Sequence, residues 1–250
     1  MDRGHLKKVI PVTIEEASVP PSDFESQKVA ATFDGLNKAL VILTPTSISD
    51  KADFGWFDEV PKKLYYKSMD IWTALGRYSQ VETESLWLRP FRFDDHEDFY
   101  KITKNPANLA FIFPAQASQA ESDYFLVHYF MKEPLGTWAL EDKSSQEMIG
   151  AIRLEKLNLT KNSAEIGYFV RQDFWGQGLA TESLKTISFL ALSQFGLQNL
   201  SLICHQENLA SQKVAQKAGF KLIRAFKGSD RYSHKMRNYL EFQLKAGDLL

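Results

Sequence analysis

The chain has 250 residues, of which 44% are hydrophobic and 24% are charged, a globular composition that excludes whole-chain disorder, collagen and coiled coil. Its 30 basic and 31 acidic side chains leave a net charge of −1, which gives no general attraction to nucleic acid, so no nucleic-acid partner is expected. The single cysteine, Cys204, excludes an intramolecular disulfide and a cysteine zinc site, and no metal is expected.

The N-terminal residues do not resemble a secretory signal, because MDRGHLKKVIPV starts with charges and lacks an apolar core. The longest purely apolar runs, such as residues 39–43, are far shorter than the ~20 residues of a membrane helix. We therefore predict no membrane partner, a reducing compartment and a cytoplasmic location.

Residues 1–85 predict an N-terminal extension. Turn formers such as Pro20-Pro21 and Thr44-Pro45 separate short apolar runs, which favours short strands joined by loops. Apolar residues recur near helical spacing in residues 62–77, which predicts a helix at the end of the extension.

A regular order of elements begins at Leu86 and predicts a second unit over residues 86–250. Its first strand covers residues 86–90. Asp94 is then expected to cap a helix that ends near Lys104, before Asn105-Pro106, and a second helix covers residues 119–131.

The next three strands are expected at residues 137–140, 148–157 and 163–170, with turn residues between them that favour an antiparallel meander. A long helix over residues 179–195 is closed by Gly196, and a strand follows at residues 199–205.

The last predicted elements are a helix over residues 208–218, which ends at Gly219, and strands near residues 220–225 and 237–244. The sequence predicts an α/β (α+β) fold: a mixed, mostly antiparallel central sheet with flanking helices, plus the N-terminal extension.

The segment most informative about function is EIGYFVRQDFWGQGLATE, residues 165–182, a predicted strand that passes through a glycine loop into a helix. Gly176 and Gly178 lack a Cβ, so their backbone amides can face a common space at the positive end of that helix. Such amides bind a phosphate or pyrophosphate. A strand-to-helix turn with no ligand is the alternative. A Walker loop would need Gly-Lys-Ser/Thr, and a dinucleotide fingerprint would need a third glycine.

This segment resembles motif A of the GNAT acyl-CoA N-acyltransferase superfamily, and NLASQKVAQKAGF, residues 208–220, resembles its motif B. The order of the two motifs, together with Leu88-Arg89-Pro90 and Phe91, is similar to the branch of ribosomal-protein N-terminal acetyltransferases. The resemblance covers about residues 86–245. It implies the GNAT fold, with a splayed strand pair, and acetyl-CoA as co-substrate.

The resemblance also implies which residues hold acetyl-CoA. The strand at residues 166–170 would splay from the strand at residues 199–205, so that main-chain groups near Tyr168, Phe169 and Val170 pair with the pantetheine arm. Asn208 would hydrogen-bond the same arm. The pyrophosphate would lie on the backbone amides and one hydroxyl of the loop, which contains Phe174, Trp175, Gly176, Gln177, Gly178, Leu179, Ala180 and Thr181.

One position departs from the superfamily pattern, which usually has Gln or Arg where this chain has Asp173. A carboxylate that pointed inward would repel a phosphate. We therefore expect Asp173 to face solvent or to cap the turn.

Acetyl transfer from a thioester to an amine requires a neutral amine, a polarised carbonyl and a proton for the departing thiolate. Glu165 is the candidate base, with a strand carboxylate in an ion pair as the alternative, and a backbone NH near Val170 would polarise the carbonyl. Many relatives have a tyrosine as acid where this chain has Ala215. Ser211 is then the candidate acid, unless it is an uninvolved serine or the thiolate leaves without one.

Three further features have both structural and functional explanations. Cys204 is expected to be a buried, inert thiol, and His205 a structural histidine. Residues 111–113 are equally consistent with core packing and with a substrate wall. Six cations in residues 221–237, against Asp230 alone, suggest a basic rim for an acidic acceptor or the coenzyme 3′-phosphate, or a solvated hairpin; the cations are Lys221, Arg224, Lys227, Arg231, Lys235 and Arg237.

The resulting hypothesis is an N-acetyltransferase that moves the acetyl group of acetyl-CoA directly to a primary amine through a ternary complex. The acceptor is a protein N-terminus or a small-molecule amine. The alternative is a non-catalytic acyl-CoA-binding module that recruits a protein partner through residues 1–85. The extension would otherwise pack on its own domain, restrict the acceptor cleft or mediate a homodimer.

Overall fold

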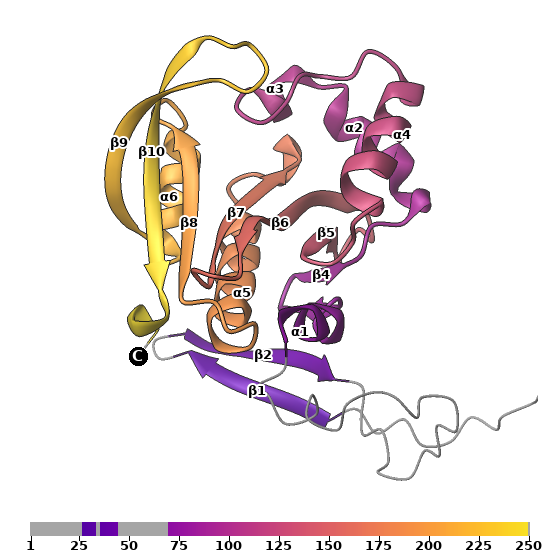
Figure 1. The fold of residues 1–250 in the computed structure, drawn as a ribbon. Coiled ribbons are helices and arrows are strands. Elements are labelled where there is room, and N and C mark those ends of the chain that lie inside the picture. Colours follow the sequence, from indigo (N-terminus) through magenta and orange to yellow (C-terminus); the bar gives the residue numbers. More distant parts are fainter. Residues whose placement is uncertain (1–26, 34–35, 45–69, 250) are drawn as a thin grey trace, which may run out of the picture.

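The computed structural model describes residues 27–33, 36–44 and 70–249 (Figure 1). Its main feature is an eight-stranded sheet of order β3–β4–β5–β6–β7–β8–β10–β9, in which only the β7–β8 neighbours are parallel. The strands are β3 (Val81–Glu82), β4 (Leu86–Arg89), β5 (Thr137–Asp142), β6 (Met148–Asn158), β7 (Ser163–Val170), β8 (Asn199–His205), β9 (Lys221–Ser229) and β10 (Met236–Lys245). The predicted mixed, mostly antiparallel sheet is confirmed.

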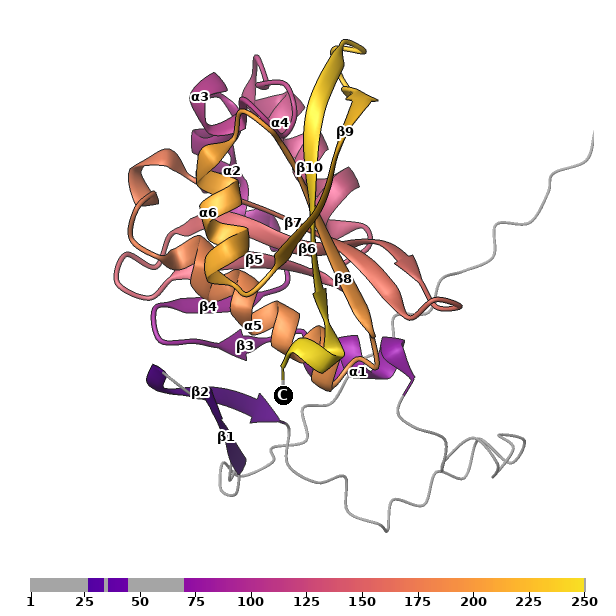
Figure 2. The ribbon, with the colours of Figure 1, turned by 90° about the vertical axis from the view of Figure 1, so that its left-hand side faces the viewer.

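Six α-helices flank this sheet in the described part of the chain (Figures 1 and 2). They are α1 (Ile71–Arg77), α2 (His96–Thr103), α3 (Pro106–Leu109), α4 (Gln119–Leu126), α5 (Leu179–Ser193) and α6 (Leu209–Lys217). Buried side chains of α1, α5 and α6 join one hydrophobic cluster with the sheet, and those of α2, α3 and α4 join a second cluster. The two clusters lie on opposite faces of the sheet, because residues of alternating strand positions belong to different clusters.

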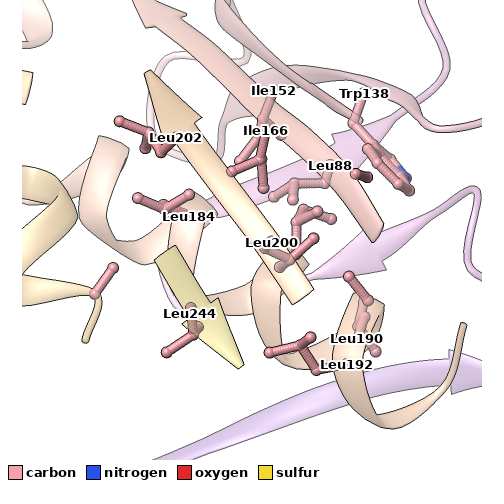
Figure 3. Packing of buried hydrophobic residues seen from close by; sticks show 14 of the residues in the cluster. Leu88, Trp138, Ile152, Ile166, Leu184, Leu190, Leu192, Leu200, Leu202 and Leu244 are labelled. Atoms are coloured by element: carbon pink, nitrogen blue, oxygen red, sulfur yellow. The ribbon is translucent and has the colours of Figure 1, made fainter. Parts of the chain in front are cut away.

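The larger cluster is made mostly of leucine and isoleucine (Figure 3). Leu184 and Leu190 of α5 are completely buried against Leu200 of β8 and Ile152 of β6. The spacing of the buried α5 residues is helical, which explains why the sequence pattern predicts this helix.

The smaller cluster is rich in phenylalanine. Phe99 of α2 and Phe130, in the π-helical turn Val127–Met131 that extends α4, pack on Phe169 of β7. The rings of Phe130 and Phe169 meet edge to face, with centroids 5.9 Å apart. This packing fixes one side of β7, the strand that leads into the glycine loop.

Residues before Leu86 form a separate two-stranded sheet and also contribute to the eight-stranded sheet. β1 (Gln27–Phe33) and β2 (Leu36–Thr44) form an antiparallel hairpin, so the short strands predicted there are present. Farther along the chain, α1 packs in the larger cluster through Leu75. β3 pairs with β4, so part of the predicted extension is continuous with the main fold. The division at residue 86 stays a prediction.

The helix predicted over residues 62–77 is described only in its last part. Helix α1 begins at Ile71, because Asp70 has an extended backbone and its carboxylate accepts hydrogen bonds from the amides of Trp72 (3.0 Å) and Thr73 (3.2 Å). Asp70 is thus an N-cap, which the apolar spacing alone does not reveal. The first part of the predicted helix, residues 62–69, lies outside the described residues.

Asp94 does not cap the next helix. A 3₁₀ turn (Phe93–Asp95) precedes α2, and the buried carboxylate of Asp95 accepts the amide of Arg92 at 2.8 Å. Asp95 also forms a two-bond ion pair with the guanidinium of Arg89. This ion pair joins β4 to the start of α2. A tertiary contact therefore determines that Asp95, and not Asp94, stabilises the start of the helix.

Helix α3 was not predicted, although its start carries a recognisable signal. Asn105 is the N-cap, with its side chain accepting from Ala107 N at 3.0 Å, and Pro106 occupies the first helical position. The sequence pattern predicts Asn105-Pro106 only as the end of α2. Predicted elements near the motifs match more closely: β8 has the expected bounds, and α5 ends two residues before the predicted Phe195.

Candidate active site

The two parallel strands β7 and β8 separate along their length. Three residue pairs join them, from Ser163↔Asn199 to Glu165↔Ser201, and the pairing stops there. Beyond Glu165 the second half of β7 stays paired with β6, up to Gly150↔Val170, while its other edge has no strand partner in the described chain. The upper ends of β7 and β8 diverge in Figure 1. The open edge of β7 beside Tyr168 and Val170 can therefore pair with an extended ligand, except at the Val170 carbonyl, which accepts the indole NH of Trp175.

Strand β6 supports this open half of β7 at very close range. A Cβ added to Gly150 would lie 2.2 Å from the carbonyl oxygen of Phe169. The side chains of Phe169 and Val170 are buried, so only their main chain can contact a ligand.

The glycine loop that follows β7 has two glycines with positive φ. Gly176 and Gly178 have φ of +78° and +88°, and no atom lies within 4 Å of the Cβ position of either. The indole NH of Trp175 donates to the carbonyl of Val170 at 2.6 Å, which fastens the loop to the end of β7. The loop is thus pinned by a side chain while its glycine backbone faces open space.

The loop ends at the N-terminus of α5, with Gly178 as N-cap. The first amide of the helix with a helical acceptor is that of Glu182, which donates to Gly178 O at 2.9 Å. The amides of Leu179, Ala180 and Thr181 precede it and lack helical acceptors. Together with the helix dipole, these amides fit a pyrophosphate.

Asp173 faces solvent, as expected. Its side chain is 62% exposed, and its carboxylate pairs with Nε of Arg171 at 2.8 Å. Arg171 in turn pairs with Glu147 and lies over the ring of Phe174. The Arg171 guanidinium neutralises the carboxylate beside the loop, so Asp173 does not oppose an anion there.

Helix α6 forms the far side of the opening. The side chain of Asn208 caps this helix by accepting from Ser211 N at 3.0 Å, and Gly219, with φ of +88°, follows its end. The hydroxyl of Tyr168 crosses from β7 and donates to Ser211 Oγ at 3.1 Å. The structure thus brings Tyr168, Ser211 and Asn208 together at the opening.

Glu165 lies at the point where β7 and β8 part, on the face of the sheet that carries α2 to α4. Its carboxylate pairs with Lys156 Nζ at 2.8 Å. Glu155 of β6 lies directly across the strand pair from Glu165 and leans toward Gly167, so that a Cβ there would be 3.8 Å from its carboxylate. The sequence pattern does not single out Glu155, because only strand register places it beside Glu165.

Comparison with known protein families identifies the family of this chain. The acetyltransferase (GNAT) domain profile matches residues 85–221, more than half of the chain. The chain belongs to the acetyltransferase (GNAT) family. A curated relative, the uncharacterized N-acetyltransferase YoaA of Bacillus subtilis (strain 168), is 26% identical over 144 residues, which cover 56% of this chain and 81% of YoaA.

Solved acetyltransferases share the fold. A GNAT-family acetyltransferase from Bacillus anthracis superposes with a TM-score of 0.61 at 17% identity, over 67% of this chain and 99% of that one. RimL, a ribosomal L7/L12 α-N-protein acetyltransferase solved with coenzyme A, gives a TM-score of 0.55 at 20% identity, over 65% of this chain and 95% of that one. The glycine loop and β7–β8 opening are therefore parts of a GNAT fold.

On the α2–α4 face of this GNAT domain, residues 111–113 span the diverging strands. The ring of Phe113 meets Phe169 of β7 at 5.9 Å, and the ring of Phe111 meets His205 of β8 at 5.3 Å. Phe113 is buried in the core, whereas Phe111 is 38% exposed. Phe113 thus packs in the core, and a role of the exposed Phe111 as a substrate wall stays a prediction.

His205 has a partner that the sequence analysis did not identify. Its Nε2 lies 3.7 Å from Asp230 in the β9–β10 hairpin, and its ring packs on Tyr239 at 4.6 Å. Burial lowers the pKa of His205, and Asp230 partly offsets this. Its neighbour Cys204 is buried, and burial raises the pKa of its thiol, which agrees with the predicted inert thiol.

The basic segment at residues 221–237 is less charged than its sequence suggests. Lys221 pairs with Asp248, Arg224 with Glu241 and Arg237 with Glu207. These carboxylates come from outside the segment, so the sequence count of local charge overstates the positive potential of the hairpin.

No helix in the described part of the chain has the length and apolar character needed to cross a membrane. No group of three or more His, Cys, Asp or Glu side chains in the same residues has the arrangement of a metal site.

Proposed function

We propose that this GNAT protein is an acetyl-CoA-dependent N-acetyltransferase that moves the acetyl group directly to a primary amine through a ternary complex. The observation that carries the proposal is the opening between β7 and β8, which leads into the glycine loop at the start of α5. An unpaired strand edge fits the amides of pantetheine, and the adjoining helix N-terminus fits the pyrophosphate.

The residues around the opening fit this coenzyme. Main-chain groups of Tyr168, Phe169 and Val170 would pair with the pantetheine arm, and the Asn208 amide group would reach it from the start of α6. The loop backbone from Phe174 to Thr181 would hold the pyrophosphate. Bound acetyl-CoA supplies the acetyl group as a thioester.

Glu165 is the proposed base for the acceptor amine. It lies on a different face of β7 from Tyr168, so the base and the hydroxyl pair approach the opening from opposite faces of the sheet. The ion pair with Lys156 holds the Glu165 carboxylate in place. Ser211, on α6, is the proposed donor to the leaving sulfur.

The proposed acceptor is a protein N-terminus or a small-molecule amine. RimL, which shares the fold, is a protein N-terminal acetyltransferase. Ala215 favours the alternative, a non-catalytic acyl-CoA-binding module, because it is completely buried and carries no acid group. The pair Tyr168 and Ser211 supplies hydroxyls at the same opening and favours the enzyme.

The test is calorimetric titration of the full chain with acetyl-CoA, followed by a thiol-release assay over N-terminal peptides and small amines. Binding with release on one acceptor supports the proposal. Binding without release on any acceptor supports the recruiting module. Absence of binding contradicts both, because both depend on the glycine loop.

A further inference from the structure

Aminolysis of a thioester places negative charge on sulfur as the C–S bond breaks. If the chain has the proposed function, a hydrogen-bond donor aimed into the β7–β8 opening would stabilise that charge. Donors on the α6 side of this opening include the hydroxyls of Tyr168 and Ser211.

The direction of their hydrogen bond decides how they can act. Tyr168 donates to Ser211 Oγ at 3.1 Å, although the two residues are 43 positions apart. The proton of Ser211 is therefore available to a third atom. A hydroxyl that accepts one hydrogen bond becomes a better donor in the next.

Cys204 is the neighbour of Ser211 at this point of the opening. Burial raises the pKa of the Cys204 thiol, and Ser211 partly offsets that rise. An interaction that lowers a thiol pKa favours the thiolate. The Ser211 hydroxyl can thus stabilise a negative charge on a neighbouring sulfur.

Tyr168 stays protonated over the whole range of enzyme assays. Burial raises its pKa to about 12, with the hydrogen bond to Ser211 acting in the opposite direction. The groups that face its hydroxyl are Ser211 and Cys204, and neither is charged at neutral pH. Tyr168 therefore remains a donor to Ser211 and does not become a phenolate.

We propose that Tyr168 is a positioning residue that orients the Ser211 hydroxyl as the hydrogen-bond donor to the departing coenzyme A sulfur. The amine nitrogen forms the new C–N bond, and the C–S bond breaks with its electron pair on sulfur. Glu165 holds the proton lost by nitrogen, and water protonates the thiolate as it leaves. Ser211 and Tyr168 give hydrogen bonds and lose no proton.

The experiment compares Tyr168→Phe, Ser211→Ala and the double variant with acetyl-CoA as donor. We expect Ser211→Ala to lower kcat about tenfold to a hundredfold, with the KM for acetyl-CoA within about twofold, because a charge-assisted hydrogen bond is lost. Tyr168→Phe should lower kcat less. The double variant should match Ser211→Ala, since Tyr168 acts through Ser211.

Two comparisons separate this role from a structural one. With p-nitrophenyl acetate, whose nitrophenolate leaves without help, both variants should react at the wild-type rate. Ser211→Thr should restore most of the kcat with acetyl-CoA. Tyr78→Phe is the matched control, because it removes another buried tyrosine hydroxyl, bonded to Gln194 Oε1 at 3.1 Å, outside the site, and it should leave kcat unchanged.

Additive losses in the double variant, or equal losses with p-nitrophenyl acetate, would overturn the proposal while leaving the acetyltransferase function intact. A wild-type chain that turns over no amine overturns the function, and the inference with it. If Tyr168→Phe does not fold, the Ser211→Ala and Ser211→Thr pair decides: a Thr variant as slow as the Ala variant contradicts the role of the hydroxyl.

Discussion

The two edges of strand β8 differ in how completely they are paired. Against β10, β8 forms seven antiparallel pairs, from Tyr239↔His205 to Lys245↔Asn199. Against β7 it forms three pairs and then parts from it. Both edges belong to one strand with the same side chains, so strand propensity cannot be the cause. The difference lies in the contacts of β7. The outer half of β7 packs closely on Gly150 of β6, and its Tyr168 hydroxyl is hydrogen-bonded to α6.

The comparison shows where the fold leaves its backbone unsatisfied. An unpaired strand edge costs free energy unless another group pairs with it. The β8–β10 edge is paired along the whole of β8, whereas the second half of β7 has no strand partner on its other edge in the described residues. Four variants test this difference, beginning with the one expected to have the largest effect.

Gly150→Ala should disrupt the support of the open edge. The new Cβ would lie 2.2 Å from Phe169 O, a contact that forces the β6–β7 backbones apart. We expect a loss of about 3 kcal/mol in the free energy of unfolding, measured by urea denaturation. Gly76→Ala in α1 is the control, since no atom lies within 4 Å of its Cβ position, and it should not destabilise the chain. Equal effects of the two variants would refute the close approach.

Glu165→Gln should abolish proton removal at the last paired position of β7. We expect kcat for the amine acceptor to fall about a hundredfold or more, with acetyl-CoA affinity unchanged in calorimetry. Glu155→Gln, its cross-strand neighbour, is the matched control and should lower kcat less. If the two variants exchange their effects, Glu155 is the base.

Gly178→Ala should weaken the anion site without changing the strand opening. Its φ of +88° costs an alanine about 1–2 kcal/mol, so stability falls and the helix N-terminus shifts. We expect acetyl-CoA affinity to fall about tenfold in calorimetry. Gly196→Ala, at the other end of α5 with φ of +74°, should have a similar stability cost and leave acetyl-CoA affinity unchanged. If Gly196→Ala loses as much acetyl-CoA affinity as Gly178→Ala, general destabilisation explains the loss in both variants.

The smallest expected effect concerns the fully paired edge, where His205 ends β8. Burial lowers its pKa in the folded chain, so the unfolded chain binds its proton more readily. The folded state therefore loses stability as pH falls below the ordinary His pKa of 6.5. His205→Gln should make Tm depend less on pH between pH 7 and the pKa of His205 in the folded state, as measured by Tm against pH. An unchanged slope would assign that dependence to other groups.

Local chemistry explains why much of the site was predictable. Asn208 and Gly219 mark the two ends of α6, because a side-chain cap and a positive-φ residue each act within one turn of the helix. The same holds for Gly176 and Gly178 in the loop before α5. The start of α2 was missed because Asp95, rather than Asp94, pairs with Arg89 on another element.

The sequence by itself determined most of the order of elements, the antiparallel meander and the glycine loop, since each depends on residues close together in the chain. The tertiary structure alone decided which side chains act together. It joined Tyr168 to Ser211, Glu165 to Glu155 and His205 to Asp230 through strand register and helix packing. These pairs depend on distances across the fold, and such distances follow from how the whole core packs.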